Sequence, residues 1–149
     1  MRLRINLSKE NFELPLAYQS ILQGVIYVLL SKSSLGNKYH NEGYTYDRKK
    51  FKCFTFSSLF GTYEIKDRKI VFEKNFYFYV SSQDEQFMKS LFEVLQFNDY
   101  LLVNKTMVNI DSFSFEQLSP FSGQKTVKIK TLSPLLIYST SNNYILVTL

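Results

Sequence analysis

The sequence predicts an α+β fold, in which an antiparallel β-sheet carries two helices on one of its faces. Two stretches, at 21–30 and 87–95, place apolar residues three and four positions apart, which is the spacing of an amphipathic helix. Most other apolar residues alternate with polar ones, as they do in strands with one buried face. The chain has 149 residues, with only five glycines and three prolines, so it is long enough to form one domain around a core.

The first half of the chain is predicted to form a strand, a helix and a second strand. Polar and apolar residues alternate over 2–7, which predicts a half-buried strand. Pro15 is expected where the first helix begins, since proline is favoured in the first helical turn. In that helix Tyr27 is expected opposite the apolar stripe, at about 100° per residue. A polar loop over 34–50 and a strand over 51–60 should follow.

The second half is predicted to begin with a hairpin that turns at 66–69, followed by a dense strand at 75–80 that is buried or packed on both sides. Residues 82–84 offer a cap for the second helix. Further strands are expected at 100–117 around a turn at Asn104-Lys105, at 125–138 with a break at Ser133-Pro134, and at 142–149. The main elements then follow the order β-α-β-β-α-β of the ferredoxin-like fold, with hairpin insertions. We therefore predict one ferredoxin-like domain over 1–149.

The chain is basic and poor in metal ligands. It has 18 Lys and Arg against 13 Asp and Glu, a net charge of +5. That balance favours a polyanionic partner such as nucleic acid or an anionic surface, and a solvated charged face explains it equally well. One cysteine and one histidine exclude an internal disulfide and argue against a cysteine or histidine metal site, so we expect no metal and no cofactor. Cys53 lies in an alternating strand and is expected to be a buried core thiol.

Polar and apolar residues alternate over the first seven positions, and this stretch is too short to be a signal peptide. No apolar run approaches the ~18 residues of a membrane-spanning helix. We therefore expect a cytoplasmic protein with no membrane partner.

His40 is the only side chain expected to titrate near neutral pH without help from its surroundings. It lies in the predicted polar loop, and basic residues gather around it, namely Lys38, Arg48, Lys49 and Lys50. This cluster suits contacts with phosphate groups, although a solvated loop explains it almost as well. A second basic patch is expected if the first strand pairs with the strand at 125–138. Its members would be Arg2, Arg4, Lys128 and Lys130, and it would place RNA against the sheet.

Four short strings occur in order along this predicted fold. They are Gln23-Gly24-Val25-Ile26-Tyr27 in the first helix, Tyr39-His40 in the loop, Phe51-Lys52-Cys53-Phe54-Thr55-Phe56-Ser57 in the second strand, and Thr131-Leu132-Ser133-Pro134 in the last long strand. Together they resemble the N-terminal half of the CRISPR repeat-processing endoribonucleases of the RAMP (repeat-associated) superfamily. The resemblance covers residues 1–138 and implies a single ferredoxin-like, RRM-like domain that corresponds to the first of the two such halves in that family.

The resemblance implies a metal-independent nuclease that cuts CRISPR repeat RNA (pre-crRNA) by attack of a 2′-hydroxyl on the adjacent phosphate. The products would carry a 2′,3′-cyclic phosphate and a 5′-hydroxyl. In the family a Tyr, a His and a Lys do this chemistry, and they fall on Tyr27, His40 and Lys52. His40 would be the general acid and Tyr27 the base or an orienting group, or the reverse, because an ordinary Tyr is a poor base. Lys52 would stabilise charge on the phosphorane oxygens.

Other interpretations stay open. Tyr27 could be a helix-packing tyrosine, His40 a surface histidine and Lys52 a solvated strand lysine. The chain could be a non-catalytic RNA-binding subunit or module of a CRISPR complex, or an interaction domain with no nucleic-acid role. The family also carries a Gly-rich loop near its C-terminus, which the glycines of this chain do not form. An exposed apolar surface is then expected where a second half would dock, and a CRISPR effector complex and a homodimer are the further partners considered.

Overall fold

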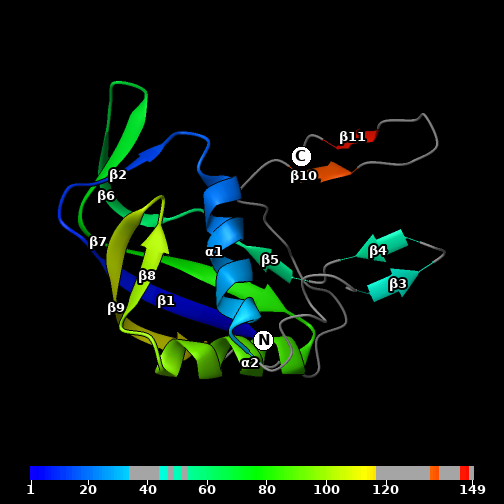
Figure 1. Cartoon of the computed structure of the whole chain (residues 1–149). Helices are drawn as coiled ribbons and strands as arrows, with labels where there is room; N and C mark the ends of the chain where they lie inside the picture. Colours follow the sequence, from blue (N-terminus) through cyan, green and yellow to red (C-terminus); the bar gives the residue numbers. More distant parts are fainter. Residues whose placement is uncertain (34–43, 47–48, 52–53, 117–134, 138–144, 148–149) are drawn as a thin grey trace, which may run out of the picture. The chain divides into compact units, whose positions relative to one another are not determined.

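The chain divides into two compact units, Met1–Gln117 and Leu118–Leu149. The computed structural model describes residues 1–33, 44–46, 49–51, 54–116, 135–137 and 145–147. The first unit is an antiparallel sheet with two helices packed against it (Figure 1). This confirms the predicted α+β, ferredoxin-like fold. The prediction that residues 1–149 form one domain stays a prediction.

Seven strands make up the main sheet. They are β1 (Arg2–Ser8), β2 (Phe12–Pro15), β5 (Phe54–Phe56), β6 (Phe60–Lys66), β7 (Lys69–Ser82), β8 (Tyr100–Val103) and β9 (Thr106–Phe115). β7 is the longest at 14 residues. β1 and β2 pair along one of its edges, and β5 and β6 pair along the other. β1 in turn lies between β7 and β9, so it is a central strand of the sheet.

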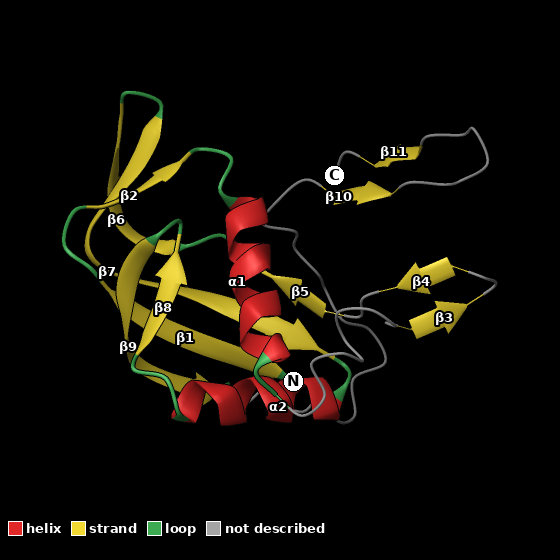
Figure 2. Ribbon diagram, in the orientation of Figure 1, coloured by secondary structure: helices red, strands yellow, loops and turns green. Residues whose placement is uncertain are grey.

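Two helices, α1 (Gln19–Ser31) and α2 (Glu85–Gln96), cover one face of this sheet (Figure 2). The predicted apolar stripe of α1 is buried there, through Leu22, Val25, Ile26, Leu29 and Leu30. α2 begins at the predicted cap: the Asp84 carboxylate accepts hydrogen bonds from the backbone N–H groups of Gln86 and Phe87. Such a cap satisfies N–H groups that the first turn leaves without a helical partner. Among the described residues, neither helix is long and apolar enough to cross a membrane.

Both predicted hairpin turns are present. β6 and β7 are joined through Asp67 and Arg68, and β8 and β9 through Asn104 and Lys105. All four turn residues have positive φ, between 50° and 65°. Two consecutive left-handed residues are typical of the two-residue turn whose twist matches that of the flanking strands.

Two predictions about local structure are wrong. Pro15 does not begin the first helix; it ends β2, where it pairs with Lys69 of β7, and α1 starts at Gln19. The stretch 51–60 is not one strand. Phe51 ends β4 (Lys49–Phe51), which pairs with β3 (Tyr44–Tyr46) in a separate hairpin within the predicted loop, while β5 and β6 join β7. Pro15 is placed by pairing with a strand distant in sequence, whereas 51–60 is divided because its parts pair with different strands.

The second unit contains one described hairpin, of β10 (Leu135–Ile137) and β11 (Ile145–Val147). The predicted C-terminal strand at 142–149 is confirmed by β11. Of the predicted strand at 125–138, residues 135–137 are described and lie in β10. The expected break at Ser133-Pro134 lies outside the described residues.

Candidate nucleic-acid interface

The two faces of β1 differ completely in chemistry. Leu3, Ile5 and Leu7 are at most 1% exposed and lie beneath the helices. Side chains alternate between the faces of a strand, so Arg2 and Arg4 point to the face that the helices leave open. The predicted half-buried strand is confirmed. Its open face therefore carries the two arginines expected to contact RNA.

β7 continues this division. Phe76, Phe78 and Val80 are buried, whereas Tyr77 and Tyr79 are half-buried on the other face. Tyr79 pairs with Arg4 in the register of β1 and β7. The predicted strand at 75–80 is buried on one side, and its other side is packed in part, through the half-buried Tyr77 and Tyr79. They were missed because the segment is apolar throughout, and the strict Phe/Tyr alternation was the signal that could have revealed them.

Arg4 is stacked on Tyr77. Its guanidinium carbon lies 3.8 Å from the centroid of the Tyr77 ring, which is well within the range of a cation–π interaction. Its Nε donates a hydrogen bond to Asn6 Oδ1 at 2.9 Å. These two contacts hold the guanidinium group over the Tyr77 ring.

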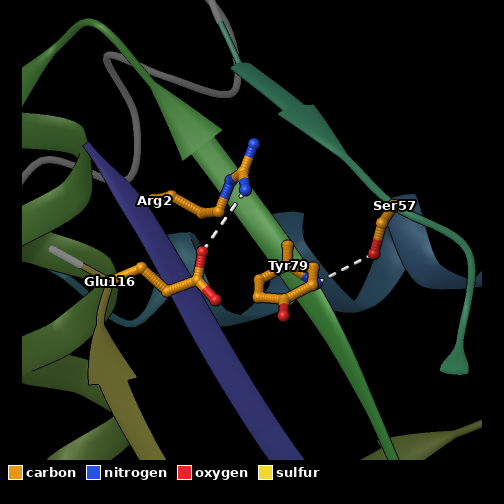
Figure 3. Close-up of polar contacts among 4 residues, drawn as sticks. All are labelled: Arg2, Ser57, Tyr79 and Glu116. Carbon is orange, nitrogen blue, oxygen red and sulfur yellow. Dashed lines mark hydrogen bonds and ion pairs between the residues drawn. The ribbon is translucent and has the colours of Figure 1, made fainter. Parts of the chain in front are cut away.

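Arg2 contacts Tyr79 in a similar way. Its guanidinium carbon lies 5.4 Å from the centroid of the Tyr79 ring. It also forms an ion pair with Glu116 at 3.3 Å (Figure 3). The backbone N–H of Tyr79 donates to the Ser57 hydroxyl at 2.9 Å, which ties β7 to the segment after β5. The charge of Arg2 is therefore partly neutralised within the protein, and that of Arg4 is not.

The pKa of the Tyr79 phenol is raised above its ordinary value. Partial burial is the largest cause, followed by a hydrogen bond and charge repulsion from Glu116, while Arg4 opposes the shift. Burial and a neighbouring carboxylate both disfavour a phenolate. Tyr79 is therefore a neutral hydrogen-bonding group at physiological pH.

Phe60 extends this surface at the sheet edge. Its side chain is 41% exposed, and its ring stacks on Tyr77 at 5.2 Å with an interplanar angle of 23°. The next residue, Gly61, passes so close to β7 that an added Cβ would lie 2.6 Å from the Asn75 carbonyl oxygen. We call the surface formed by Arg2, Arg4, Phe60, Tyr77 and Tyr79 the Arg–Tyr face.

Polar groups, among them the Asp111 carboxylate, border the Arg–Tyr face on β9. The Asn6 amide donates to the Ser112 hydroxyl at 2.9 Å, and the Ser8 hydroxyl donates to Asp111 at 2.6 Å. Ser112 and Ser114 are exposed. The face as a whole thus offers aromatic rings, guanidinium groups and short hydrogen-bonding side chains.

Tyr27 lies on the helix side of the sheet. It is half-buried, and its ring meets Phe54 of β5 edge-on at 5.7 Å. Phe54 in turn stacks on Phe87 of α2 at 5.0 Å. The expectation that Tyr27 points away from the packed side of α1 is therefore wrong, because β5 lies beside the helix and covers that flank.

The other predicted site residues are described only in part. His40, Lys38, Arg48, Lys52, Lys128 and Lys130 lie outside the described residues. Lys49 and Lys50 lie in β4, opposite Tyr46 and Thr45. The strand neighbours of β1 are β7 and β9, not the expected partner at 125–138. Whether Tyr27, His40 and Lys52 come together stays a prediction, as do the RNA contacts.

Within the described ranges, no three His, Cys, Asp or Glu side chains form a group that could hold a metal ion. The exposed apolar side chains include Tyr100, Leu102 and Met107, on the β8–β9 hairpin, at 50%, 61% and 53% exposure. An exposed apolar surface is also what the sequence leads us to expect. Within the part of the chain that the structure describes, no segment is seen to cover these three side chains.

The chain is a ferredoxin-like domain with an open, arginine-bearing sheet face. Among solved structures, the chain is similar to a CRISPR-associated protein Cas6, with a TM-score of 0.66 and 25% identity, over 92% of this chain and 55% of that one. The chain thus has a Cas6-like fold, as its sequence motifs suggested.

Two further structures share the fold. One is a Cas6-related protein from Pyrococcus furiosus, with a TM-score of 0.62 and 19% identity, over 95% of this chain and 58% of that one. The other is described as a RAMP protein binding different RNA substrates, with a TM-score of 0.65 and 16% identity, over 96% and 60%. The chain spans less than two thirds of the length of each of these proteins. No protein-family profile matches it, and no curated protein matches it in sequence.

Proposed function

We propose that the chain acts in CRISPR RNA processing as an endoribonuclease that cuts repeat RNA. The observation that carries this proposal is the Cas6-like fold, found together with the Tyr27, His40 and Lys52 motifs in the family's order. The basic charge of the chain, +5, and the arginines of the open face suit a polyanionic substrate.

The proposed reaction needs no metal. The 2′-hydroxyl attacks the adjacent phosphorus, so that a new O2′–P bond forms as the P–O5′ bond breaks. A base takes the 2′-hydroxyl proton, and an acid gives a proton to the departing 5′ oxygen. We assign His40 as the acid, Tyr27 as the base or orienting group, and Lys52 as the cation that stabilises the phosphorane. The packing of Tyr27 against Phe54 gives its ring a fixed position, which favours the orienting role.

The test is cleavage of a labelled repeat RNA in EDTA by the full chain. Wild type is compared with His40→Ala, Lys52→Ala and Tyr27→Phe, and Lys89→Ala, which removes an exposed lysine of α2, is the charge-matched control. Loss of the acid should slow cleavage roughly 100- to 10,000-fold. A 2′-deoxy substitution at the scissile nucleotide should abolish the cut, and the wild-type product should carry a cyclic phosphate. Cleavage that requires a divalent cation, or that His40→Ala leaves unchanged, would refute the proposal.

A second candidate is a non-catalytic RNA-binding subunit or module of a CRISPR complex. The Arg–Tyr face favours it, since it offers stacking and hydrogen-bonding groups independent of His40. Binding without any cut, equal in wild type and His40→Ala, would identify this function. Association with an effector complex or with a second copy of the chain would be a further step in either case.

A further inference from the structure

β5 is joined to the sheet by a short ladder. The strand has three residues, Phe54–Phe56, and pairs with the end of β7. Its two phenylalanines are half-buried and pack against the core beneath the helices. A segment with few backbone partners opens easily unless side-chain contacts hold it in place. The position of β5 therefore depends on its contacts with the helices.

Phe54 contacts both helices. Tyr27 of α1 meets its ring edge-on at 5.7 Å, and Phe87 of α2 stacks on it at 5.0 Å with an interplanar angle of 21°. Phe87 is 2% exposed, and its backbone N–H donates to the Asp84 cap at 3.2 Å, so it is held firmly at the start of α2. Ring pairs at such distances attract each other beyond the apolar area that they bury. Phe54 thus connects the start of α2 to Tyr27.

A second contact joins α1 to the segment that follows β5. Tyr18 directly precedes α1 and is 6% exposed, and its phenol oxygen accepts a hydrogen bond from the buried backbone N–H of Leu59 at 3.0 Å. The Gln19 amide also donates to the exposed Ser58 hydroxyl at 2.9 Å. A buried N–H that loses its acceptor is destabilising, so the Tyr18 hydroxyl holds Leu59 in place.

The two contacts are well separated. Tyr18 and Tyr27 lie nine positions apart in the sequence, which is about 13 Å along a helix. Two attachments at this separation oppose both sliding and tilting of α1 against the β5 segment. The place of Tyr27 is therefore set twice, by a contact with its own ring and by the attachment of the helix that carries it.

Resting on the proposed function, we propose that Phe54 and Tyr18 are positioning residues for the RNA cleavage reaction. They hold Tyr27 where its hydroxyl acts on the reacting atoms, and they touch neither the RNA nor those atoms themselves. A displacement of about 1 Å in a reacting group can slow a reaction by about 100-fold. Contacts that hold Tyr27 from two sides keep such displacements rare.

The proposal predicts an effect on the chemical step and none on affinity. Phe54→Leu removes the ring and keeps an apolar side chain, whereas Tyr18→Phe removes one hydroxyl and keeps the buried ring. Both substitutions leave every basic residue in place, so RNA binding should be unchanged. The rate constant of the cut should fall on the order of tenfold for each variant, because positioning contributes in the transition state.

A double-mutant cycle on the rate constant separates positioning from a general loss of packing. In a chain that already carries Tyr27→Phe, the hydroxyl is absent and Phe54 has no reacting group to position. Phe54→Leu should then slow the cut no further, because residues that act as one unit are not additive. A general structural defect would slow the cut by the same factor in both backgrounds.

The experiment measures single-turnover cleavage of a labelled repeat RNA by the full chain in EDTA. A range of protein concentrations separates the rate constant of the cut from affinity. Phe92→Leu is the control for Phe54→Leu, since it removes a half-buried ring of α2 that packs on β9 instead. Tyr63→Phe removes an exposed hydroxyl of β6 and is the control for Tyr18→Phe. Thermal unfolding establishes that each variant is folded at the assay temperature.

NMR of the full chain with labelled tyrosine gives a readout that needs no activity. An aromatic ring shifts the resonances of protons packed against it. The Tyr27 ring signals, assigned with Tyr27→Phe, should therefore move toward those of an exposed tyrosine in Phe54→Leu. They should also move in Tyr18→Phe and stay unchanged in Phe92→Leu. Signals that neither Phe54→Leu nor Tyr18→Phe moves would overturn the inference.

The kinetic outcomes distinguish this inference from the proposed nuclease. If Tyr27→Phe is slow while Phe54→Leu and Tyr18→Phe cut at the wild-type rate, the inference is wrong and the nuclease stands. Equal losses from Phe54→Leu in both backgrounds, or an equal loss in Phe92→Leu, would also overturn it. If Tyr27→Phe cuts at the wild-type rate, the inference falls and the nuclease is judged on His40 alone. A wild-type chain that binds RNA and never cuts it would refute the nuclease, and the positioning role with it.

Discussion

The guanidinium carbon of Arg4 lies 3.8 Å from the centre of the Tyr77 ring, across the two central strands of the sheet. Both side chains are half-buried, so water screens their interaction only in part. A cation–π contact of this kind contributes to folding as well as to the shape of the surface.

The contribution of this contact can be isolated by a double-mutant cycle. Arg4→Gln, Tyr77→Leu and the double variant should show a coupling free energy of about 1 kcal/mol in urea unfolding. The cycle removes the separate cost of losing the Asn6 hydrogen bond, since both Arg4 variants lose it. Additive effects would show that the two groups touch without stabilising each other.

Gly61 should resist substitution. Gly61→Ala would place a methyl group 2.6 Å from the Asn75 carbonyl oxygen and 3.0 Å from Phe76 Cβ, so β6 would have to separate from β7. We expect a loss of about 1–3 kcal/mol in the free energy of unfolding. Gly24→Ala in α1 is the matched control, because beyond its chain neighbours and the backbone of its own helix no described atom lies within 4 Å of the added carbon. It should stabilise the helix by about 1 kcal/mol. Equal effects of the two substitutions in urea unfolding would contradict this reasoning.

The cap of α2 depends on one carboxylate. Asp84 accepts hydrogen bonds from the N–H groups of Gln86 at 2.8 Å and Phe87 at 3.2 Å. Asp84→Ala should cost about 1 kcal/mol of unfolding free energy, whereas Asp84→Asn should cost much less. Glu93→Ala, at an exposed position of the same helix, is the control and should change stability little. Thermal and urea unfolding measure the stability of all three variants. An Asp84→Asn variant as unstable as Asp84→Ala would refute a capping role.

The exposed ion pair of Glu13 and Lys69 should contribute a small amount to the free energy of unfolding, and this contribution should be lost in acid. Lys69 Nζ donates to Glu13 Oε2 at 2.8 Å. The hydrogen bond and the charge of Lys69 lower the pKa of Glu13 below its ordinary value of 4.5. A lowered pKa in the folded state stabilises the protein above 4.5 and loses that effect as the pH falls through the folded-state pKa.

The corresponding measurement compares the unfolding midpoints of wild type and Glu13→Gln at pH 7 and pH 3. The difference should be present at pH 7, become smaller at pH 3, and shrink at pH 7 in high salt, because exposed charges are screened. A difference of the same size at pH 3 and pH 7 would trace the effect to packing and not to charge.

The sheet and the helices could be predicted from the sequence because their patterns are local. The alternation in Leu3, Ile5 and Leu7 and the helical spacing of the two amphipathic segments report burial directly. Pro15 was misplaced because its strand is defined by pairing with Lys69, which no local pattern reveals. The stretch at 51–60 was divided for the same reason, since its parts pair with different partners.

Only the charged residues of the candidate site could be predicted from the sequence. Arg2 and Arg4 are the charged residues of an alternating strand and do lie on the open face. The local pattern does not assign Tyr77, Tyr79 and Phe60 to this face, since an aromatic residue in a strand is equally compatible with a buried and an exposed face. The flank of α1 that holds Tyr27 is covered by β5, a contact between segments that helical periodicity cannot foresee.

β7 is paired along both of its edges, with β1 and β2 on one side and β5 and β6 on the other. A fluctuation that displaces Tyr77 or Tyr79 must therefore open two ladders at once. Their backbone amides should be among the slowest in the molecule to exchange with deuterium. A surface anchored on so protected a strand is preorganised, so a ligand that docks on it forfeits little conformational entropy of the protein.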